Sequence, residues 1–336
     1  MNPTPTAADS PPEQANRLLA RTVNIGLDLG APEELGWTIQ VTDHHLDQCA
    51  RAGFTAVRLA TSLARHRDAA DPRQLDPRTL EHLDQIIQAA SERGLAVVIA
   101  NMHDPDLMAD PPRHRGRLLA CTRQLAAATQ HHGPSLILEP LAEPRGALDP
   151  VWNDYLRDLC AAVRDVDPDR TLMAGPRSYN NARFLAELSL PAGERNLILT
   201  LHHYWPIRFT MQGEVWLGPT ELGDPATWLG TTWDGTPQQR TELETGFEAV
   251  AVYARTQQLP VFIGEFGTTN NADMPARVRW TQFNRQLAEH HGFAWGCWSY
   301  APTFAIYDTG HDRWHQALLD ALIPSSRLPD GVTLAP

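Results

Sequence analysis

Two glutamates stand at the ends of apolar runs, where a buried strand would present them at the edge of a sheet. Glu143 follows "LILEPLA", and Glu265 lies within "VFIGEFG". Two carboxyl groups can carry out acid–base or glycosyl-transfer chemistry when one is held protonated and the other is ionised. We therefore predict that Glu143 and Glu265 are the catalytic pair. The alternative is that they form structural ion pairs, for example with Arg58.

Other polar and aromatic residues stand at the ends of further apolar runs. The histidines could orient a glutamate, and Tyr204 could tune the ionisation of a carboxyl group by hydrogen bonding. Trp298 could support one face of a substrate. Asp104 is either a third carboxylate of the site or the cap of the turn that follows it. The residues predicted to contact substrate are Arg58, His103, Asp104, Tyr179, His202, Tyr204, Trp205 and Trp298.

Glu139 is the third acidic residue near these runs. We expect it to face a neighbouring helix or the solvent rather than to take part in catalysis. The histidines show no H-E-x-x-H spacing and the four cysteines show no C-x-x-C spacing, so the sequence predicts no metal site. We also expect no organic cofactor, because acid–base chemistry requires none.

Eight short apolar runs alternate with amphipathic segments and would position these side chains. One helix is well marked, because Asp76 and Pro77 supply a cap and a first-turn proline, and Gly94 ends the apolar stripe. Strands that alternate with helices predict a parallel sheet, and eight such units favour a single-domain (β/α)8 TIM barrel. No G-x-G-x-x-G follows the first run, which argues against a dinucleotide fold. The runs are residues 23–30, 56–60, 96–103, 136–140, 171–175, 197–204, 261–267 and 294–300.

A long segment at residues 205–240 follows the sixth apolar run and carries four tryptophans. Loops of this length in compact domains are usually functional. The tryptophans either line an apolar cleft or anchor the loop on the barrel. They are Trp205, Trp216, Trp228 and Trp233.

Composition limits the possible partners. The 336-residue chain has a net charge of -12, and all 28 of its basic residues are arginines without a dense cluster, so we expect no nucleic-acid partner. Neither a signal peptide nor a membrane-spanning run is recognisable, so we expect a cytoplasmic protein. We expect a disordered leader at residues 1–20, a barrel at 21–323 and a C-terminal tail at 324–336. The sequence gives no oligomeric state.

Five segments together resemble the signature segments of family-5 glycoside hydrolases, the cellulase type. They are "GFTAVRL", "LAEP", "LHHYWP", "VFIGEFGTT" and "WSYAPTFAIYD", and the likeness extends from about residue 22 to residue 323. The resemblance implies a (β/α)8 barrel in which Glu143 is the general acid/base and Glu265 the nucleophile. It also implies supporting roles for Arg58, His103, His202, Tyr204 and Trp298.

The sequence also departs from that family's pattern. In the family an asparagine precedes the acid/base and bonds the 2-hydroxyl of the sugar, and here that residue is Ala142. Several other polar or aromatic positions are altered too. They are His103-Asp104 after the third run, Leu63 after the second, Tyr179-Asn180 after the fifth, Met211 in "FTMQG" and Trp298-Ser299 in the eighth.

Two enzymatic functions follow from these features. The first is a cellulase-like barrel repurposed for acid/base chemistry on a non-sugar small molecule. Its substrate would be a polyketide-like secondary metabolite, and its reaction a dehydration or a hydroxyl conjugate addition that closes a ring. We favour this function, because losing the bond to the 2-hydroxyl should slow a glycosidase strongly. The alternative is a retaining β-glycoside hydrolase of weakened activity. A non-catalytic carbohydrate-binding barrel would not need both glutamates.

Overall fold

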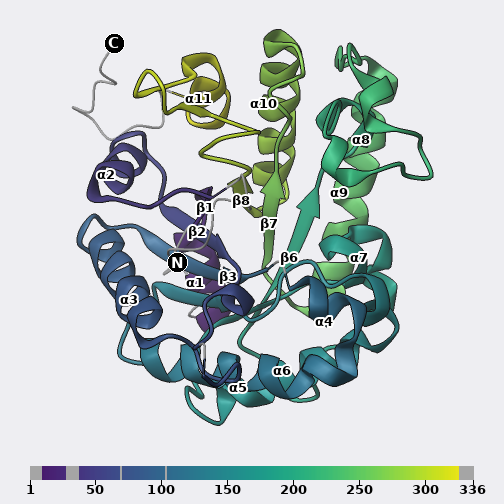
Figure 1. Ribbon diagram of the computed structural model, residues 1–336. Helices are drawn as coiled ribbons and strands as arrows, with labels where there is room; N and C mark the ends of the chain where they lie inside the picture. The colour runs from purple at the N-terminus through teal and green to yellow at the C-terminus, as the bar shows by residue number, and fades with distance from the viewer. Residues whose placement is uncertain (1–9, 28–37, 69, 103, 325–336) are drawn as a thin grey trace, which may run out of the picture.

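Eight parallel strands form a closed barrel in the computed structural model, which describes residues 10–27, 38–68, 70–102 and 104–324 (Figure 1). Each strand pairs with its neighbours in chain order, and β1 closes the barrel by pairing with β8. The strands are β1 Arg21–Gly26, β2 Ala56–Thr61, β3 Ala96–Asn101, β4 Leu136–Glu139, β5 Leu172–Ala174, β6 Leu197–His203, β7 Val261–Phe266 and β8 Ala294–Cys297. This architecture confirms the predicted (β/α)8 TIM barrel.

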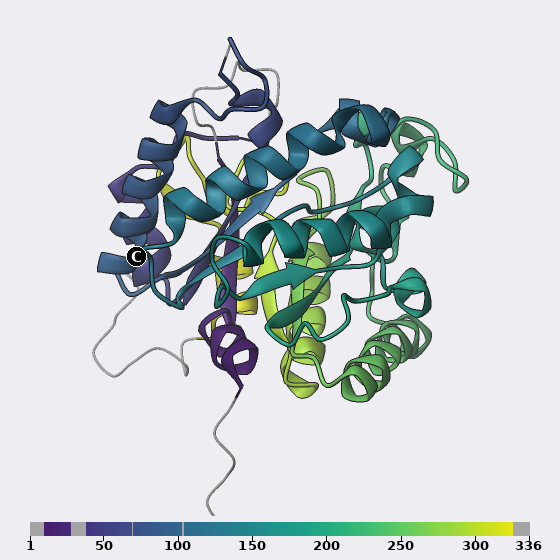
Figure 2. The same cartoon turned by 90° about the horizontal axis from the view of Figure 1, so that it is seen from below.

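Helices surround the strands and form the outer layer of the molecule (Figures 1 and 2). Helix α3 begins as predicted, with the Asp76 side chain accepting a hydrogen bond from the backbone N–H of Arg78. The helices are α1 Pro11–Leu18, α2 Asp43–Arg51, α3 Pro77–Glu92, α4 Pro105–Ala109, α5 Pro111–Thr129, α6 Trp152–Arg164, α7 Arg177–Asn180, α8 Ile207–Thr210, α9 Pro237–Gln257, α10 Met274–His290 and α11 Gln316–Leu322. A small hairpin adds β9 Tyr307–Asp308 and β10 Arg313–Trp314.

The interior of the barrel is layered, because alternate residues of each strand point inward. An apolar layer at the N-terminal ends of the strands includes Ala56, Val98 and Ile137. Two residues further along their strands, Arg58 and Glu139 point the same way and begin a polar layer. The chemistry-bearing side chains therefore lie above an apolar floor, towards the C-terminal ends of the strands.

Helix α1 lies within the region expected to be a disordered leader, so that expectation was wrong for residues 11–18. Ala15 and Leu19 are buried against the apolar floor of the barrel. Asn16 donates from Nδ2 to the carbonyl oxygen of Val261 at 3.2 Å. A helix of 8 residues with so few apolar positions gives little periodic signal, because its burial depends on the barrel that it covers.

The four tryptophans of the long segment at 205–240 differ in their burial. Trp228 and Trp233 are buried, whereas the exposed fractions of Trp205 and Trp216 are 48% and 64%. Trp228 and Trp233 therefore fit the predicted anchoring role, whereas an apolar cleft lined by the tryptophans stays a prediction. Along the part of the chain that the structure describes, we find no helix with the length and apolar character needed to cross a membrane.

Candidate active site

Glu143 and Glu265 meet at the C-terminal end of the barrel. Glu265 lies in β7, and Glu143 lies in the turn that follows β4. One oxygen of each carboxylate and one ring nitrogen of His202 all lie within 4.8 Å of one another. The two acids predicted from the sequence are therefore brought together, with a histidine between them.

The turn that carries Glu143 has an uncommon backbone conformation. Glu143 has φ 54°, a left-handed value that few residues other than glycine adopt. Its backbone N–H donates to Oδ1 of Asn180 at 3.2 Å, and the N–H of Ala142 donates to the carbonyl oxygen of Asn101 at 2.8 Å. These bonds fix the direction in which the Glu143 carboxylate points.

Both oxygens of Glu265 accept hydrogen bonds. Arg58 donates from Nη1 to Oε1 at 2.7 Å, and the Tyr204 hydroxyl donates to Oε2 at 2.8 Å. Burial raises the pKa of the Glu265 carboxyl group above its usual value. The charges of His202 and Arg58 and the hydrogen bond from Tyr204 act in the opposite direction. Burial and the adjacent carboxylate also hold the pKa of Tyr204 well above its usual value, so its hydroxyl remains a donor.

Glu139 does not face a helix or the solvent, so that expectation was wrong. Its side chain is completely buried and accepts a hydrogen bond from Nε of Arg58 at 2.8 Å. Arg58 also donates from Nη1 to Oδ1 of Asn24 at 2.8 Å. Strand alternation accounts for this position, because Ile137 points into the barrel and the residue two positions later must point the same way. Arg58 thus sits between two carboxylates, Glu139 beside it and Glu265 above.

His202 links the two predicted catalytic residues. Its Nδ1 lies 2.9 Å from Oε1 of Glu143 and 3.5 Å from Oε2 of Glu265. Its Nε2 faces two donors, Nη2 of Arg58 at 3.4 Å and Nδ2 of Asn180 at 3.5 Å. The neutral ring therefore carries its proton on Nδ1, directed at the carboxylates. Burial alone lowers the pKa of His202, but Glu265 and Glu143 outweigh burial and raise it above its usual value.

Asn180 is a site residue that the sequence reasoning did not select. Three consecutive residues, Ser178, Tyr179 and Asn180, have φ values of 56°, 66° and 54°. This left-handed turn buries Asn180, whose Nδ2 donates to Oε1 of Glu139 at 3.2 Å. Tyr179, predicted to contact substrate, is 49% exposed, and its ring lies 5.0 Å from the guanidinium of Arg145. Neither Ser nor Tyr predicts such a turn, so the sequence offered no clear signal for it.

The other residues predicted to contact substrate differ in their position and contacts. Asp104 is buried, caps α4 through the N–H of Leu107 and accepts a hydrogen bond from Nη2 of Arg117 at 2.6 Å. It therefore acts as the cap, the second of its two predicted roles. His103 lies outside the described residues. Trp205 is exposed at the rim, and its carbonyl oxygen accepts from Nε1 of Trp280 at 3.1 Å.

One side of the barrel mouth is apolar. Ala60, Met102 and Ala142 form a buried cluster, and the partly buried Trp298 packs against it. The backbone of Trp298 also lies so close to Gly267 that a Cβ there would overlap its carbonyl oxygen. This explains the second glycine of "GEFG". The charged groups described above come from β2, β4, β6 and β7 and from the turn after β4.

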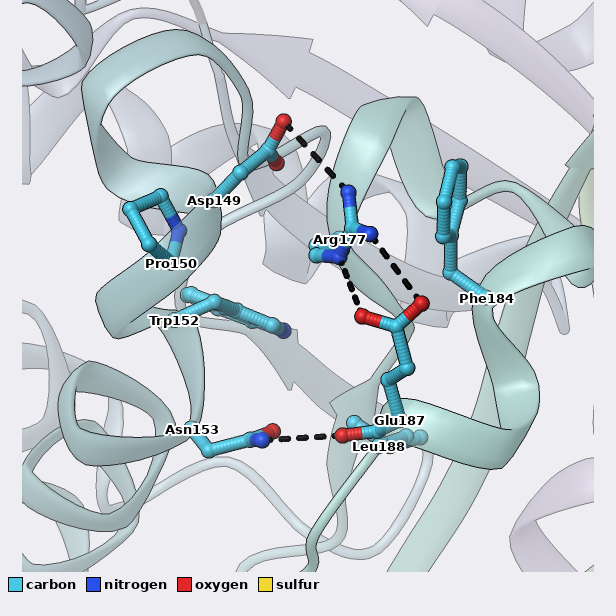
Figure 3. A pocket seen from close by; sticks show the side chains of 8 residues that line it. All are labelled: Asp149, Pro150, Trp152, Asn153, Arg177, Phe184, Glu187 and Leu188. Carbon is cyan, nitrogen blue, oxygen red and sulfur yellow. Dashed lines mark hydrogen bonds and ion pairs between the residues drawn. The ribbon is translucent and has the colours of Figure 1, made fainter.

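A cavity of about 380 Å³ is lined by a different set of residues (Figure 3). It is enclosed by the start of α6 and by the segment after β5, and its lining includes Trp152, Arg177 and Glu187. Arg177 donates from Nε and Nη2 to the Glu187 carboxylate at 2.8 and 3.1 Å. Its positive charge is therefore already paired. Neither Glu143 nor Glu265 lines this cavity.

The sequence model of the family described as Cellulase (glycosyl hydrolase family 5) matches residues 25–303. The chain belongs to glycosyl hydrolase family 5. Its barrel aligns with the structure of Cel5A from Thermotoga maritima in complex with cellobiose. The TM-score is 0.87 and the identity 34%, over 93% of this chain and 100% of Cel5A. A second structure of Cel5A, in complex with mannotriose, aligns with the same scores.

Two of the curated relatives are endoglucanases. Endoglucanase H of Acetivibrio thermocellus is 26% identical over 332 residues, which are 97% of this chain and 35% of the relative. Endoglucanase B of Ruminococcus albus is 25% identical over 274 residues, 74% of this chain and 62% of the relative. This family-5 chain thus spans about a third of the length of the first relative and less than two thirds of the second.

These comparisons contradict the favoured prediction that the protein is a repurposed enzyme with a non-sugar substrate. The relatives are named endoglucanases, and the aligned structures hold cellobiose or mannotriose. Nothing in them supports a dehydratase or cyclase. That expectation gave too much weight to the altered position Ala142 and too little to the polar groups that surround the two glutamates.

Proposed function

We propose that this protein is a retaining β-glycoside hydrolase that acts on β-linked glucans. The observation that carries the proposal is the close approach of Glu143 and Glu265, whose nearest oxygens lie within 4.8 Å. Retaining glycosidases hold their two carboxyl groups about 5–5.5 Å apart, whereas inverting ones leave about 6.5–9.5 Å for a water molecule. The short separation favours direct attack by a carboxylate on the sugar.

In the first step, Glu265 attacks the anomeric carbon while Glu143 gives its proton to the glycosidic oxygen. The bond to the leaving sugar breaks, and a covalent glycosyl–enzyme ester forms at Glu265. In the second step, Glu143 takes a proton from water as the water attacks the anomeric carbon. The ester breaks, Glu265 is released as a carboxylate, and Glu143 is protonated again. Two inversions at one carbon retain the β configuration.

The neighbours of the pair suit these two roles. Arg58 and Tyr204 each bind one oxygen of Glu265, so the nucleophile is held in one orientation and its negative charge is compensated. His202 donates towards Glu143, the group that must both give and receive a proton. A cation at the same place is disfavoured, because both oxygens of Glu265 are already occupied and Arg58 supplies a positive charge.

The substrate class follows from the relatives and from the rim of the site. Cel5A is described with cellobiose and with mannotriose, and the curated relatives are endoglucanases. Exposed Trp205 and partly buried Trp298 offer flat apolar surfaces of the kind on which sugar rings can pack. Ala142 supplies no hydrogen bond to a sugar, so we expect a slow enzyme.

Hydrolysis of an aryl β-cellobioside by the purified chain tests the proposal. Glu143→Gln and Glu265→Gln should each reduce the rate by at least about 10²–10⁴-fold, the range typical of acid–base groups. Glu242→Gln, an exposed carboxylate on α9, is the matched control and should retain full activity. Wild-type activity no higher than that of Glu265→Gln would refute the proposal.

A further inference from the structure

A cluster of one carboxylate and two imidazoles lies on the outer surface of the barrel, away from the catalytic pair. Asp84 belongs to α3, and His131 and His132 belong to the turn between α5 and β4. Helices α3 and α5 are neighbours in the outer layer. The turn precedes the first residue of β4, so the cluster lies at the end of the barrel opposite to Glu143.

The three side chains converge on one point. Nε2 of His131 lies 2.9 Å from Oδ1 of Asp84, and Nε2 of His132 lies 2.7 Å from the same oxygen. The two imidazole rings are 4.2 Å apart between centroids and are tilted by 36°. Three donor atoms from two elements therefore lie within 4.8 Å of one another, close enough to share one ion.

We propose that Asp84, His131 and His132 form a binding site for a divalent transition-metal ion such as Zn²⁺. Zinc binds imidazole nitrogen and carboxylate oxygen at about 2.0–2.2 Å, so neighbouring ligands of a tetrahedral ion stand about 3.3 Å apart. Each nitrogen has to move away from the oxygen by roughly half an ångström to reach that spacing. His131 is 62% exposed in its side chain, which leaves it free to make this adjustment.

The backbone that carries both histidines is held rigidly in place. Arg170 is buried and donates from its guanidinium group to five carbonyl oxygens, which belong to this turn and to the ends of α5 and β4 that flank it. Its Nε donates to Oδ2 of Asp167 at 2.9 Å, which balances the charge. The carbonyls belong to Thr129, Gln130, His132, Gly133 and Leu136. Asp84 is equally fixed, because its helix packs through buried Leu83 and Ile87. A preformed arrangement of this kind lowers the entropy lost when an ion binds.

The donor set selects the class of metal. Two imidazoles and one carboxylate suit Zn²⁺, Ni²⁺ or Cu²⁺, whereas Mg²⁺ and Ca²⁺ prefer oxygen ligands. A bound ion would connect α3 to the turn before β4 and would stabilise the folded state, because the unfolded chain does not hold the three ligands together. The site would act on stability and not on the hydrolytic reaction.

Calorimetric titration of the untagged, chelator-treated protein with zinc sulfate tests the site. The wild type should bind one equivalent more than Asp84→Asn and His132→Asn, and the exposed His131→Asn should lose the same equivalent. Saturating Zn²⁺ should raise the Tm of the wild type by a few degrees and that of the variants by much less. Any zinc bound at Glu143, His202 and Glu265 would be the same in the wild type and in the three variants. The difference in stoichiometry between the wild type and each variant therefore measures the proposed site alone.

His311→Asn is the matched control, because His311 contacts Asp308 at 2.8 Å in an exposed pair with one imidazole. This variant should bind zinc as the wild type does. Equal stoichiometry and affinity in the wild type and in Asp84→Asn would overturn the proposal, as would a wild-type Tm that zinc does not raise.

Discussion

At the scale of single residues, opposing effects act on the pKa of the buried Glu265 carboxyl group. Burial raises the pKa of Glu265, and its bonds to Arg58 and Tyr204 counter that effect. In the proposed mechanism Glu265 must be ionised to attack, so we expect the balance between these effects to set the lower pH limit of activity.

Tyr204→Phe should move that limit to higher pH. The Tyr204 hydroxyl stabilises the ionised form of Glu265 and lowers its pKa, so its removal raises that pKa. A hydrogen bond to a charged group contributes about 1.5–3 kcal/mol, equivalent to roughly one to two pH units. The pH dependence of kcat/KM measures the shift. If kcat/KM of the variant fell at the same acidic pH as that of the wild type, the bond from Tyr204 would not control the ionisation of Glu265.

Ala142→Asn should increase the glycosidase activity roughly tenfold or more, because bonds to the 2-hydroxyl strengthen in the transition state and contribute several kcal/mol. Ala142 is fully buried beside Met102, so the larger side chain should also lower stability by about 1–3 kcal/mol. Ala142→Leu adds similar volume without an amide and serves as the control. An equal rise with leucine, or no rise in a folded asparagine variant, would argue against a role for the amide.

At the scale of elements, strand ends and tight turns place the site residues. Strand alternation directs Arg58 and Glu139 into the barrel, and the left-handed turn at residues 178–180 brings Asn180 beneath Glu143. A close contact between segments also matters, because the backbone after β7 passes directly against the backbone after β8 at Gly267.

Gly267→Ala should severely destabilise the protein, by about 3 kcal/mol or more, because its Cβ would overlap the carbonyl oxygen of Trp298. Gly246→Ala is the matched control within α9, where a Cβ meets no atom within 4 Å. That change should raise stability by roughly 0.5–1 kcal/mol, since alanine favours helix. Chemical denaturation of both variants gives the comparison. Equal stability of the two variants would mean that the backbone at residues 267 and 298 can shift to accommodate a Cβ at little cost.

At the scale of the whole molecule, the sequence was sufficient to predict the barrel and the approach of two glutamates at its mouth. Eight alternating apolar runs predicted the fold, and the positions of Glu143 after one run and Glu265 within another predicted that the two carboxylates converge. The orientation of Glu139 was predicted wrongly because all four residues of β4 are buried, so the sequence did not show which of them point inward. Asn180 and α1 could not be predicted in the same way, because a left-handed turn and a short covering helix depend on tertiary contacts. The favoured function was wrong because Ala142 and the other altered positions were given more weight than the polar groups around the two glutamates.

Acid stability of the whole fold should depend on His203, a partly buried residue of β6 whose ring stacks on Trp280 and meets the edge of Phe247. Burial lowers the pKa of His203 to about 4, below the value of about 6.5 in an unfolded chain. The unfolded state therefore binds the proton first, and stability falls as the pH drops from about 6.5 towards 4.

His203→Phe should remove this part of the acid sensitivity. Between pH 7.5 and 5 the wild type should lose about 2 kcal/mol more of its free energy of unfolding than the variant does. Urea denaturation at the two pH values measures both losses. The same loss in both proteins would place the acid sensitivity elsewhere.

The most direct test of the central claim is the configuration of the first product. Proton NMR during hydrolysis of a soluble β-glucan oligosaccharide distinguishes the two anomers before they interconvert. Because Glu143 and Glu265 lie close together, we predict that the β-anomer accumulates first. Initial accumulation of the α-anomer, or no product above that formed by Glu265→Gln, would contradict the account.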